Sequence, residues 1–222
     1  MSGSVIPSAV QRIAVLGAGH VGPVIARLAL DAGFEVTIAA SGSPENLELI
    51  AQIVIPGVEA RRATAAVVAA DMVVLAIPLH RFPALDAGLL AGKLVVDAMN
   101  YWAPADGVVP MFESQEFSSS EIVQRQLSQS TVIKSLNQIA YQDLEEGRRP
   151  AGSPDRHAIG VAGDDSNAAM VVAEVIDSIG YEPILLGSLS AGRVLQPGGP
   201  VFGAVLTRLE FERAIHTTAV QA

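Results

Sequence analysis

Three glycines near the N-terminus have the spacing of a nucleotide-binding turn. Gly17, Gly19 and Gly22 form the pattern G-x-G-x-x-G directly after the apolar run 12–16 and at the start of a helical pattern over 21–32. In this context the first glycine permits a tight turn, and the second lets the backbone approach a diphosphate. The third lets the helix pack closely on the strand, with the diphosphate at the helix N-terminus. The pattern therefore predicts a dinucleotide site; the alternative is a glycine-rich turn without a ligand.

The residues after the second predicted strand bear on the choice between NAD and NADP. NAD-selective folds carry Asp or Glu at the tip of this strand, about 20 residues beyond the glycines, to hold the ribose 2′-hydroxyl. Here the strand ends in alanines and continues into Ser41, Gly42 and Ser43, whose hydroxyls and amides suit a 2′-phosphate. The alternative role for Ser43 is to cap the next helix. The loop favours NADP(H), although the usual arginine is missing from it and only Arg61 or Arg62 is expected within reach.

Alternating apolar runs and helical patterns must position these residues. Unbroken apolar runs predict strands buried on both faces, and the segments between them predict helices. The predicted strands are 12–16, 34–40, 58–62, 71–77, 93–98, 131–135, 157–162 and 182–186, and the predicted helices are 21–32, 44–53, 64–70, 118–129, 136–146, 165–179 and one after Pro200. The alternation predicts an α/β fold, a doubly wound, mostly parallel Rossmann sheet with a small C-terminal extension.

Three regions are expected along the chain. Residues 1–10 are expected to form a flexible N-terminus, and residues 11–187 the NADP-binding Rossmann domain. Residues 188–222 are expected to form an extension that shapes the substrate cleft or a dimer interface, with Leu195, Gln196, Pro197 and Phe202 as the residues that do so.

Composition excludes several classes of protein. The 222 residues include 14 basic and 23 acidic ones, for a net charge of −9, so nucleic acid is not an expected partner. The absence of cysteine excludes disulfides, thiolate metal sites and cysteine nucleophiles, and no two histidines have metal-ligand spacing. No apolar run approaches about 18 residues and the N-terminus lacks a signal-peptide pattern, so a cytoplasmic location without a membrane partner is expected.

Six short motifs occur in an order that resembles a known family. They are GAGHVG, SGSPENL, LAIP, VVDAMN, VIKSLN and VAGDD, which begin at residues 17, 41, 75, 95, 132 and 161. The order resembles that of the NADPH-dependent coenzyme F-420 reductases, and the cytosolic domain of the STEAP metalloreductases is similar. The resemblance covers roughly residues 11–200 and implies hydride transfer between NADPH and a deazaflavin, coenzyme F-420, or a related flavin.

The resemblance also implies where this chain binds its cofactor. The cofactor-binding residues would be Gly17, Ala18, Gly19, His20, Val21 and Gly22 of the turn, then Ile77 and Pro78 on the adenosine-to-diphosphate side, Met99 and Asn100 near the nicotinamide ribose, and Ser135, Leu136 and Asn137 near the nicotinamide. The last three groups lie in loops at carboxyl ends of predicted strands, where doubly wound folds bind ligands. Such hydride transfer depends on positioning and desolvation, so no acid–base residue is required. His80 is the one catalytic candidate, and a solvated loop histidine is the alternative.

The second substrate remains open at this point. Tyr101 and Trp102 could stack on a flavin-like ring, or they could pin a loop or a dimer contact. Lys134 could face a substrate or be structural. The acceptor could also be an imine, a flavin or a ferric chelate, and a redox sensor that binds NADP(H) without turnover is a further alternative. A small-molecule substrate and a homodimer are expected.

Overall fold

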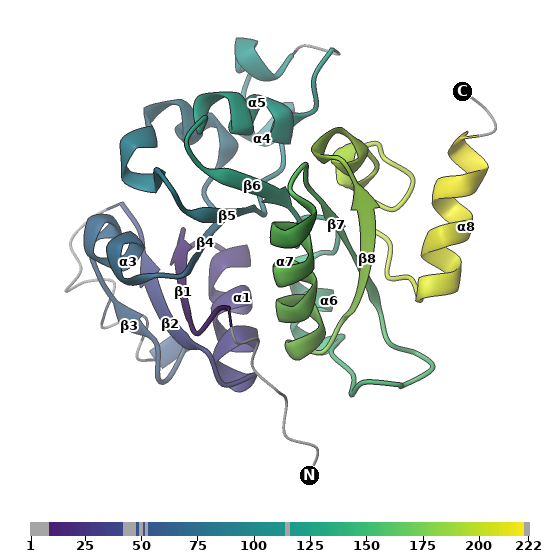
Figure 1. Ribbon diagram of the computed structural model, residues 1–222, viewed down its shortest axis with the longest axis horizontal. Helices are drawn as coiled ribbons and strands as arrows, with labels where there is room; N and C mark the ends of the chain where they lie inside the picture. The colour runs from purple at the N-terminus through teal and green to yellow at the C-terminus, as the bar shows by residue number, and fades with distance from the viewer. Residues whose placement is uncertain (1–8, 42–47, 49–50, 52, 114–115, 220–222) are drawn as a thin grey trace.

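The computed structural model describes residues 9–41, 48, 51, 53–113 and 116–219. Within them, eight strands form one sheet in the order β3-β2-β1-β4-β5-β6-β7-β8 (Figure 1). The strands are β1 Arg12–Leu16, β2 Glu35–Ala39, β3 Glu59–Ala60, β4 Met72–Leu75, β5 Leu94–Asp97, β6 Thr131–Lys134, β7 Ala158–Ala162 and β8 Glu182–Gly187. Each of the eight predicted strands, including the short polar one at 58–62, is therefore present.

The first six strands are parallel and have the order of a dinucleotide-binding fold. After β3 the chain crosses to β4, on the other side of β1, so the strand order reverses between β1 and β4, which is the point where such folds bind ligands. Unbroken runs such as β4, in which all four residues are buried, fit strands covered on both faces. The predicted α/β, doubly wound, mostly parallel sheet is confirmed.

The last two strands run in the opposite direction and are displaced along the sheet. β7 is antiparallel to β6, and the pairing joins Lys134 to Ala162, the last residue of each strand. Because the two strands meet only at these ends, β7 begins beyond the carboxyl end of β6. The side chains of Ser135 and Gln138 then bond to the backbone of β7, at Gly160 and Ala158. β7 therefore packs along one side of the loop that follows β6.

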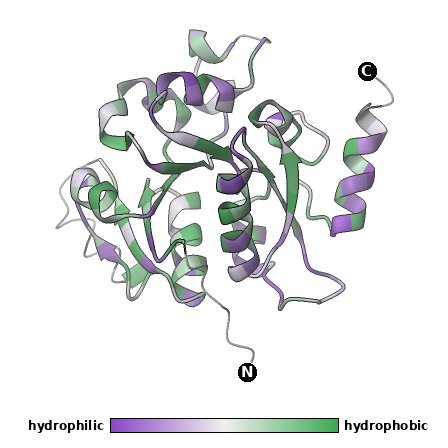
Figure 2. Ribbon diagram, viewed as in Figure 1, coloured by the Kyte–Doolittle hydropathy of each residue, from purple (hydrophilic) through white to green (hydrophobic). Residues whose placement is uncertain are grey.

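Helices cover both faces of the sheet (Figure 1). On one face lie α1 Val21–Asp31, α6 Tyr141–Glu146 and α7 Ser166–Ser178, and on the other α3 Ala63–Ala69, α5 Ser119–Gln126 and the 3-10 turns η1 Leu79–Ala84 and η2 Ala87–Leu90. Two buried apolar clusters separate these helices from the strands. Figure 2 shows the hydrophobic residues gathered in the central strands and the faces packed on them.

The C-terminal extension packs against the last two strands. It contains η4 Leu189–Leu195 and α8 Arg208–Ala219, the helix predicted after Pro200. Leu195, Val201 and Phe211 form a third buried cluster with residues of β7 and β8. The short elements α4 Ala103–Asp106 and η3 Pro110–Phe112 follow β5. The extension thus packs on β7 and β8, beside the carboxyl ends of the parallel strands.

One predicted helix is wrong over its first half. Residues 136–146 have helical spacing, yet α6 begins only at Tyr141. Leu136 has a left-handed backbone with φ of 63°, which ends regular structure after β6. Asn137 and Gln138 then use their side chains to bond to η4 and β7. Of the predicted helix 44–53, only residues 48, 51 and 53 are described, and all three are helical.

The predicted flexible N-terminus falls mostly outside the described residues. Residues 1–8 of it are not among them, and Val10 is buried in the core.

Candidate dinucleotide-binding site

The glycine turn between β1 and α1 is built as its spacing predicts. Gly17 has φ of +126°, and a Cβ there would collide with the carbonyl group of Ala76. A Cβ at Gly22 would collide with the carbonyl oxygen of Gly17. At Gly19, by contrast, a Cβ would meet no atom within 4 Å. The first and third glycines are therefore required by packing, whereas the second leaves open space beside the backbone.

The N-terminus of α1 is available to an anion. Its N-cap residue, His20, makes no side-chain capping bond, and no acidic residue lies in the first turn. The free N–H groups and the positive end of an 11-residue helix therefore face the turn. The His20 ring itself stacks on Tyr141, with ring centroids 5.0 Å apart. The structure thus shows His20 held by packing against the start of α6.

A cavity of about 510 Å³ opens at this turn and continues along the carboxyl ends of β2 and β4. Its volume lies within the range of about 300–1,000 Å³ typical of small-molecule sites. The lining residues are Leu16, Gly17, Ala18, Gly19, Ala39, Ala40, Ser41, Ala63, Ala76, Ile77, Pro78, Arg81, Ala84 and Leu85. Six predicted residues are therefore on its surface, at the turn, after β2 and after β4. Gly42 and Ser43 lie outside the described residues.

An arginine that the sequence did not predict reaches the loop after β2. Arg81 Nη1 lies 3.1 Å from Ser41 Oγ, across a separation of 40 residues. Arg61, one of the two predicted arginines, is instead paired with Glu59 at 2.7 Å. Arg62 is exposed and does not line the cavity. The usable signal was the position of Arg81 after β4, because parallel strands bring the residues that follow them to one edge.

The predicted residues after β5 and β6 form a second group, joined by amide bonds. Asn100 Nδ2 donates to the carbonyl of Asn137 at 2.7 Å, and Asn137 Nδ2 donates to Asn100 Oδ1 at 2.8 Å. Asn137 Nδ2 also donates to the carbonyl of Leu195 at 2.7 Å. Asn137 is buried, and its Oδ1 has no hydrogen-bond partner among the described residues. A buried acceptor without a donor costs about 1–3 kcal/mol, and Asn137 is not among the residues that line the cavity at the glycine turn.

Other predicted residues of this group make hydrogen bonds within the protein. Met99 is buried, and its N–H donates to Asp97 Oδ1 at 3.0 Å. Ser135 donates to the carbonyl of Gly160 at 2.8 Å. Lys134, considered as a substrate-facing cation, is fully buried and lies 3.4 Å from Asp97 Oδ2. Burial lowers the pKa of Lys134, although the neighbouring carboxylate opposes this shift. The pair fixes the ends of β5 and β6 under the two asparagines.

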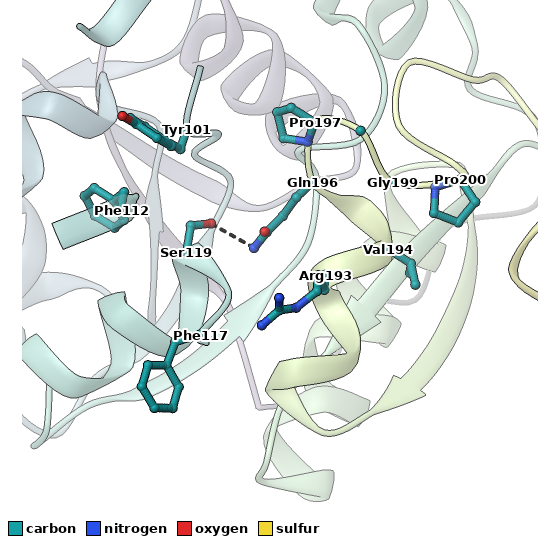
Figure 3. A pocket seen from close by; sticks show the side chains of 11 residues that line it. Tyr101, Phe112, Phe117, Ser119, Arg193, Val194, Gln196, Pro197, Gly199 and Pro200 are labelled. Atoms are coloured by element: carbon teal, nitrogen blue, oxygen red, sulfur yellow. Dashed lines mark hydrogen bonds between the residues drawn. The ribbon is translucent and has the colours of Figure 1, made fainter. Parts of the chain in front are cut away.

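A second cavity, of about 430 Å³, lies between the loop after β5 and the extension (Figure 3). The rings of Tyr101, Phe112 and Phe117 lie on one side of it, and residues 193–200 on the other. Gln196 Nε2 donates to Ser119 Oγ at 2.9 Å and joins the two sides. Of the extension residues predicted to shape a pocket, Gln196 and Pro197 line this cavity, while Leu195 is buried and does not line it.

The aromatic pair after β5 holds loops together, as the alternative interpretation proposed. The Tyr101 phenol donates to Glu113 and accepts from the N–H of Val109. The bond to Glu113 raises the pKa of Tyr101. Trp102 stacks on Phe202 of the extension, with ring centroids 6.4 Å apart and an angle of 28°. Phe202 therefore contacts the loop after β5, rather than the second cavity itself.

His80 has a carboxylate partner. Its Nδ1 lies 3.0 Å from Asp106 Oδ1, and Asp106 also accepts the N–H of Trp102 at 2.9 Å. The pair ties η1 to α4 at the carboxyl edge of the sheet. The solvated-histidine alternative is thus incomplete, because the ring is held by a nearly buried carboxylate.

The described residues contain neither a candidate metal centre nor a candidate membrane span. No group of three or more His, Cys, Asp or Glu side chains there could hold a metal ion. No helix in the same part of the chain is long and apolar enough to cross a membrane.

Comparisons with known proteins agree with this arrangement. Residues 12–101 match the model of a family described as NADP oxidoreductase coenzyme F420-dependent. The chain is 23% identical over 193 residues to the metalloreductase STEAP3 of Rattus norvegicus. That match covers 86% of this chain and 37% of the metalloreductase, so the chain spans little more than a third of this relative's length.

Solved structures with the same fold include two of nearly equal size. A hypothetical protein from Sinorhizobium meliloti has a TM-score of 0.74 and 28% identity, over 89% of this chain and 95% of its own. A proposed F420-dependent NADP-reductase from Arthrobacter sp. FB24 has a TM-score of 0.69 and 27% identity, over 90% of this chain and 100% of its own. An imine reductase from Pseudomonas sp., at 20% identity, shares the fold with a TM-score of 0.57 over 95% of this chain and 62% of its own. The resemblance stated from the motifs is confirmed, and the matches support an NADP oxidoreductase.

Proposed function

From the match of residues 12–101 to an NADP oxidoreductase family, we propose that this protein transfers hydride between NADP(H) and a deazaflavin, coenzyme F-420, or a related flavin. The observation that carries the proposal is the cavity of about 510 Å³ around the glycine turn. The residues present fit the cofactor: Gly19 leaves open space, and the uncapped α1 N-terminus suits a diphosphate. Ser41 and Arg81 stand at the end of the cavity formed by β2.

When bound, the cofactor supplies or accepts the hydride. The task of this chain is to bind, orient and exclude water, which suits a site without an acid–base pair. Ile77 and Pro78 line the cavity beside the turn, and the family resemblance implies that they lie on the adenosine-to-diphosphate side. We propose that Asn137, in the loop after β6, helps to orient the nicotinamide end of the cofactor; its Oδ1 is buried and has no hydrogen-bond donor among the described residues. Its amide nitrogen is already fixed by Asn100 and by Leu195 of η4.

The second cavity is proposed as the site of the hydride acceptor. It begins at Tyr101, the residue directly after Asn100, so it adjoins the loops assigned to the nicotinamide. Three aromatic rings on one side and a Gly–Gly–Pro segment on the other suit a flat ring. The extension, residues 188–222, would then complete the acceptor site, beside a Rossmann domain formed by residues 11–187. A homodimer and a cytoplasmic location remain predictions of the same account.

Turnover with a panel of acceptors tests this function. We expect the full chain to oxidise NADPH with coenzyme F-420 or a free flavin, and more slowly with a ferric chelate or a cyclic imine. Binding of NADPH, followed by calorimetry, is measured on the same preparation. NADPH binding without turnover of any acceptor would refute the reductase and favour the redox sensor, while absence of binding would refute both.

A further inference from the structure

We infer that Arg81 binds the 2′-phosphate of NADP(H) and makes this site select NADP(H) over NAD(H). The inference rests on the proposed function of the cavity and adds the residue that recognises the phosphate. Arg81 lies in η1, after β4, whereas the sequence led us to expect only Arg61 or Arg62 within reach of the loop after β2. The fold brings it to that loop across 40 residues of chain.

The first support is the charge of the cavity. Among its described lining residues, Arg81 alone carries a charge. The tip of β2, where NAD-selective folds place Asp or Glu, consists of Ala39 and Ala40. An unopposed guanidinium beside this tip attracts a phosphate dianion and gives no equivalent partner to a 2′-hydroxyl. The charge therefore favours the phosphorylated cofactor.

The second support is the bonding of the guanidinium. Arg81 Nη1 donates to Ser41 Oγ at 3.1 Å, and no ion pair among the described residues includes Arg81. A guanidinium has five N–H donors, so a single bond to a hydroxyl leaves most of them available to phosphate oxygens. The Ser41 hydroxyl can reorient its own proton toward the same phosphate. Arg81 and Ser41 thus form a two-sided phosphate site.

The third support is that the arginine is held on a fixed segment. Leu79 and Phe82, on either side in η1, are 1% and 0% exposed. The neighbouring His80 is held by Asp106. The backbone that carries Arg81 is therefore anchored in the core, which limits the conformational entropy lost when the side chain binds a ligand.

The other candidate cation is already engaged. Arg61 pairs with Glu59 at 2.7 Å, and this bond lowers the pKa of the Glu59 carboxyl. The net charge of the Arg61–Glu59 pair is near zero, so it offers little attraction to a dianion. Arg61 is also absent from the lining of the cavity. Arg61 therefore provides a matched control. It is an arginine at the same edge of the sheet, but it is already paired with Glu59, two residues before it.

The affinities of the protein for two nucleotides that differ by one phosphate test the inference. We would measure the affinity of the full chain for 2′,5′-ADP and for 5′-AMP by calorimetry, in the wild type, Arg81→Gln, Arg81→Lys and Arg61→Gln. The wild type should bind 2′,5′-ADP at least tenfold more tightly than 5′-AMP. Arg81→Gln should weaken 2′,5′-ADP by about 10–100-fold and leave 5′-AMP within about twofold, as expected for lost charge-assisted bonds. Arg81→Lys should restore part of the loss, and Arg61→Gln should leave the ratio unchanged.

The outcomes separate this inference from the proposed function. Two results would overturn the role of Arg81 while the nucleotide site stands. One is that Arg81→Gln weakens the binding of 2′,5′-ADP and of 5′-AMP equally. The other is that the ratio of the two affinities changes only in Arg61→Gln. A wild type that binds neither nucleotide would overturn the proposed function, and this inference with it.

Discussion

The three glycines of the turn have different surroundings, so the same substitution should affect them differently. Gly22→Ala forces a Cβ against the Gly17 carbonyl oxygen and should lower the free energy of unfolding by several kcal/mol. Gly19→Ala enters open space and should change stability by less than about 1 kcal/mol. It should nevertheless weaken NADPH binding at least tenfold, because the methyl group occupies the proposed path of the diphosphate. Urea denaturation and calorimetry measure the two effects, and unchanged NADPH affinity in Gly19→Ala would place the diphosphate elsewhere.

A single carboxylate links the starts of β1 and β4, and it should make the free energy of unfolding depend on pH in the acidic range. Asp71 accepts from the backbone N–H groups of Gln11 and Arg12 and from the Arg12 guanidinium. The bond to the Arg12 side chain, with those to the backbone, lowers the pKa of Asp71 to about 2, from 3.8. The stabilisation is therefore complete above the unfolded value and is lost as the pH falls from about 4 toward 2.

The variant Asp71→Asn tests this dependence. At neutral pH it should be less stable than the wild type by about 1 kcal/mol, a value reduced because the Arg12–Asp71 pair is partly exposed. The difference should shrink as the pH falls toward 2, where the wild-type carboxyl also becomes neutral. Denaturation at a series of pH values measures it, and a difference that stays constant with pH would refute the assignment.

At the scale of elements, one asparagine joins the loops after β5 and β6 to η4. Asn137→Ala removes its bonds to Asn100 and Leu195 together with the unpaired Oδ1. We expect at least a tenfold fall in kcat for NADPH oxidation and a loss of about 1–3 kcal/mol in stability. Ser130→Ala, which removes a buried bond to the carbonyl of Leu90 before the start of β6, is the control and should affect stability alone. Equal kcat values for the two variants would argue against a role for Asn137 in orienting the cofactor.

The elements also show what could be read from the sequence and what could not. Strands buried on both faces have a local signal, so runs such as β4 were predicted closely. The steric roles of Gly17 and Gly22 followed from their spacing. The start of α6 was missed because the left-handed Leu136 and the bonds of Asn137 depend on β7 and η4, which come later in the chain. Arg81 was missed because its contact with Ser41 exists only once β2 and β4 share an edge.

At the scale of the whole molecule, two of the contacts between the extension and the parallel half of the fold connect it to the loops around the second cavity. Gln196 bonds to Ser119, and Phe202 stacks on Trp102. Phe202→Ala should therefore raise the KM for the acceptor several-fold while leaving NADPH affinity within about twofold. Leu209→Ala, on the exposed surface of α8, is the control and should change neither value. An unchanged KM for the acceptor in Phe202→Ala would contradict a role of the Phe202–Trp102 contact in shaping the acceptor site.

The central claim is hydride transfer from NADPH, and its most direct test is a single turnover. The full chain would be mixed anaerobically with coenzyme F-420 and NADPH deuterated at the transferred position, and absorbance of the oxidised deazaflavin followed by stopped flow. The account predicts rapid bleaching that slows with deuterium, much slower bleaching with NADH, and the label in the reduced deazaflavin. Bound NADPH without bleaching, with this acceptor or with a free flavin, would contradict it.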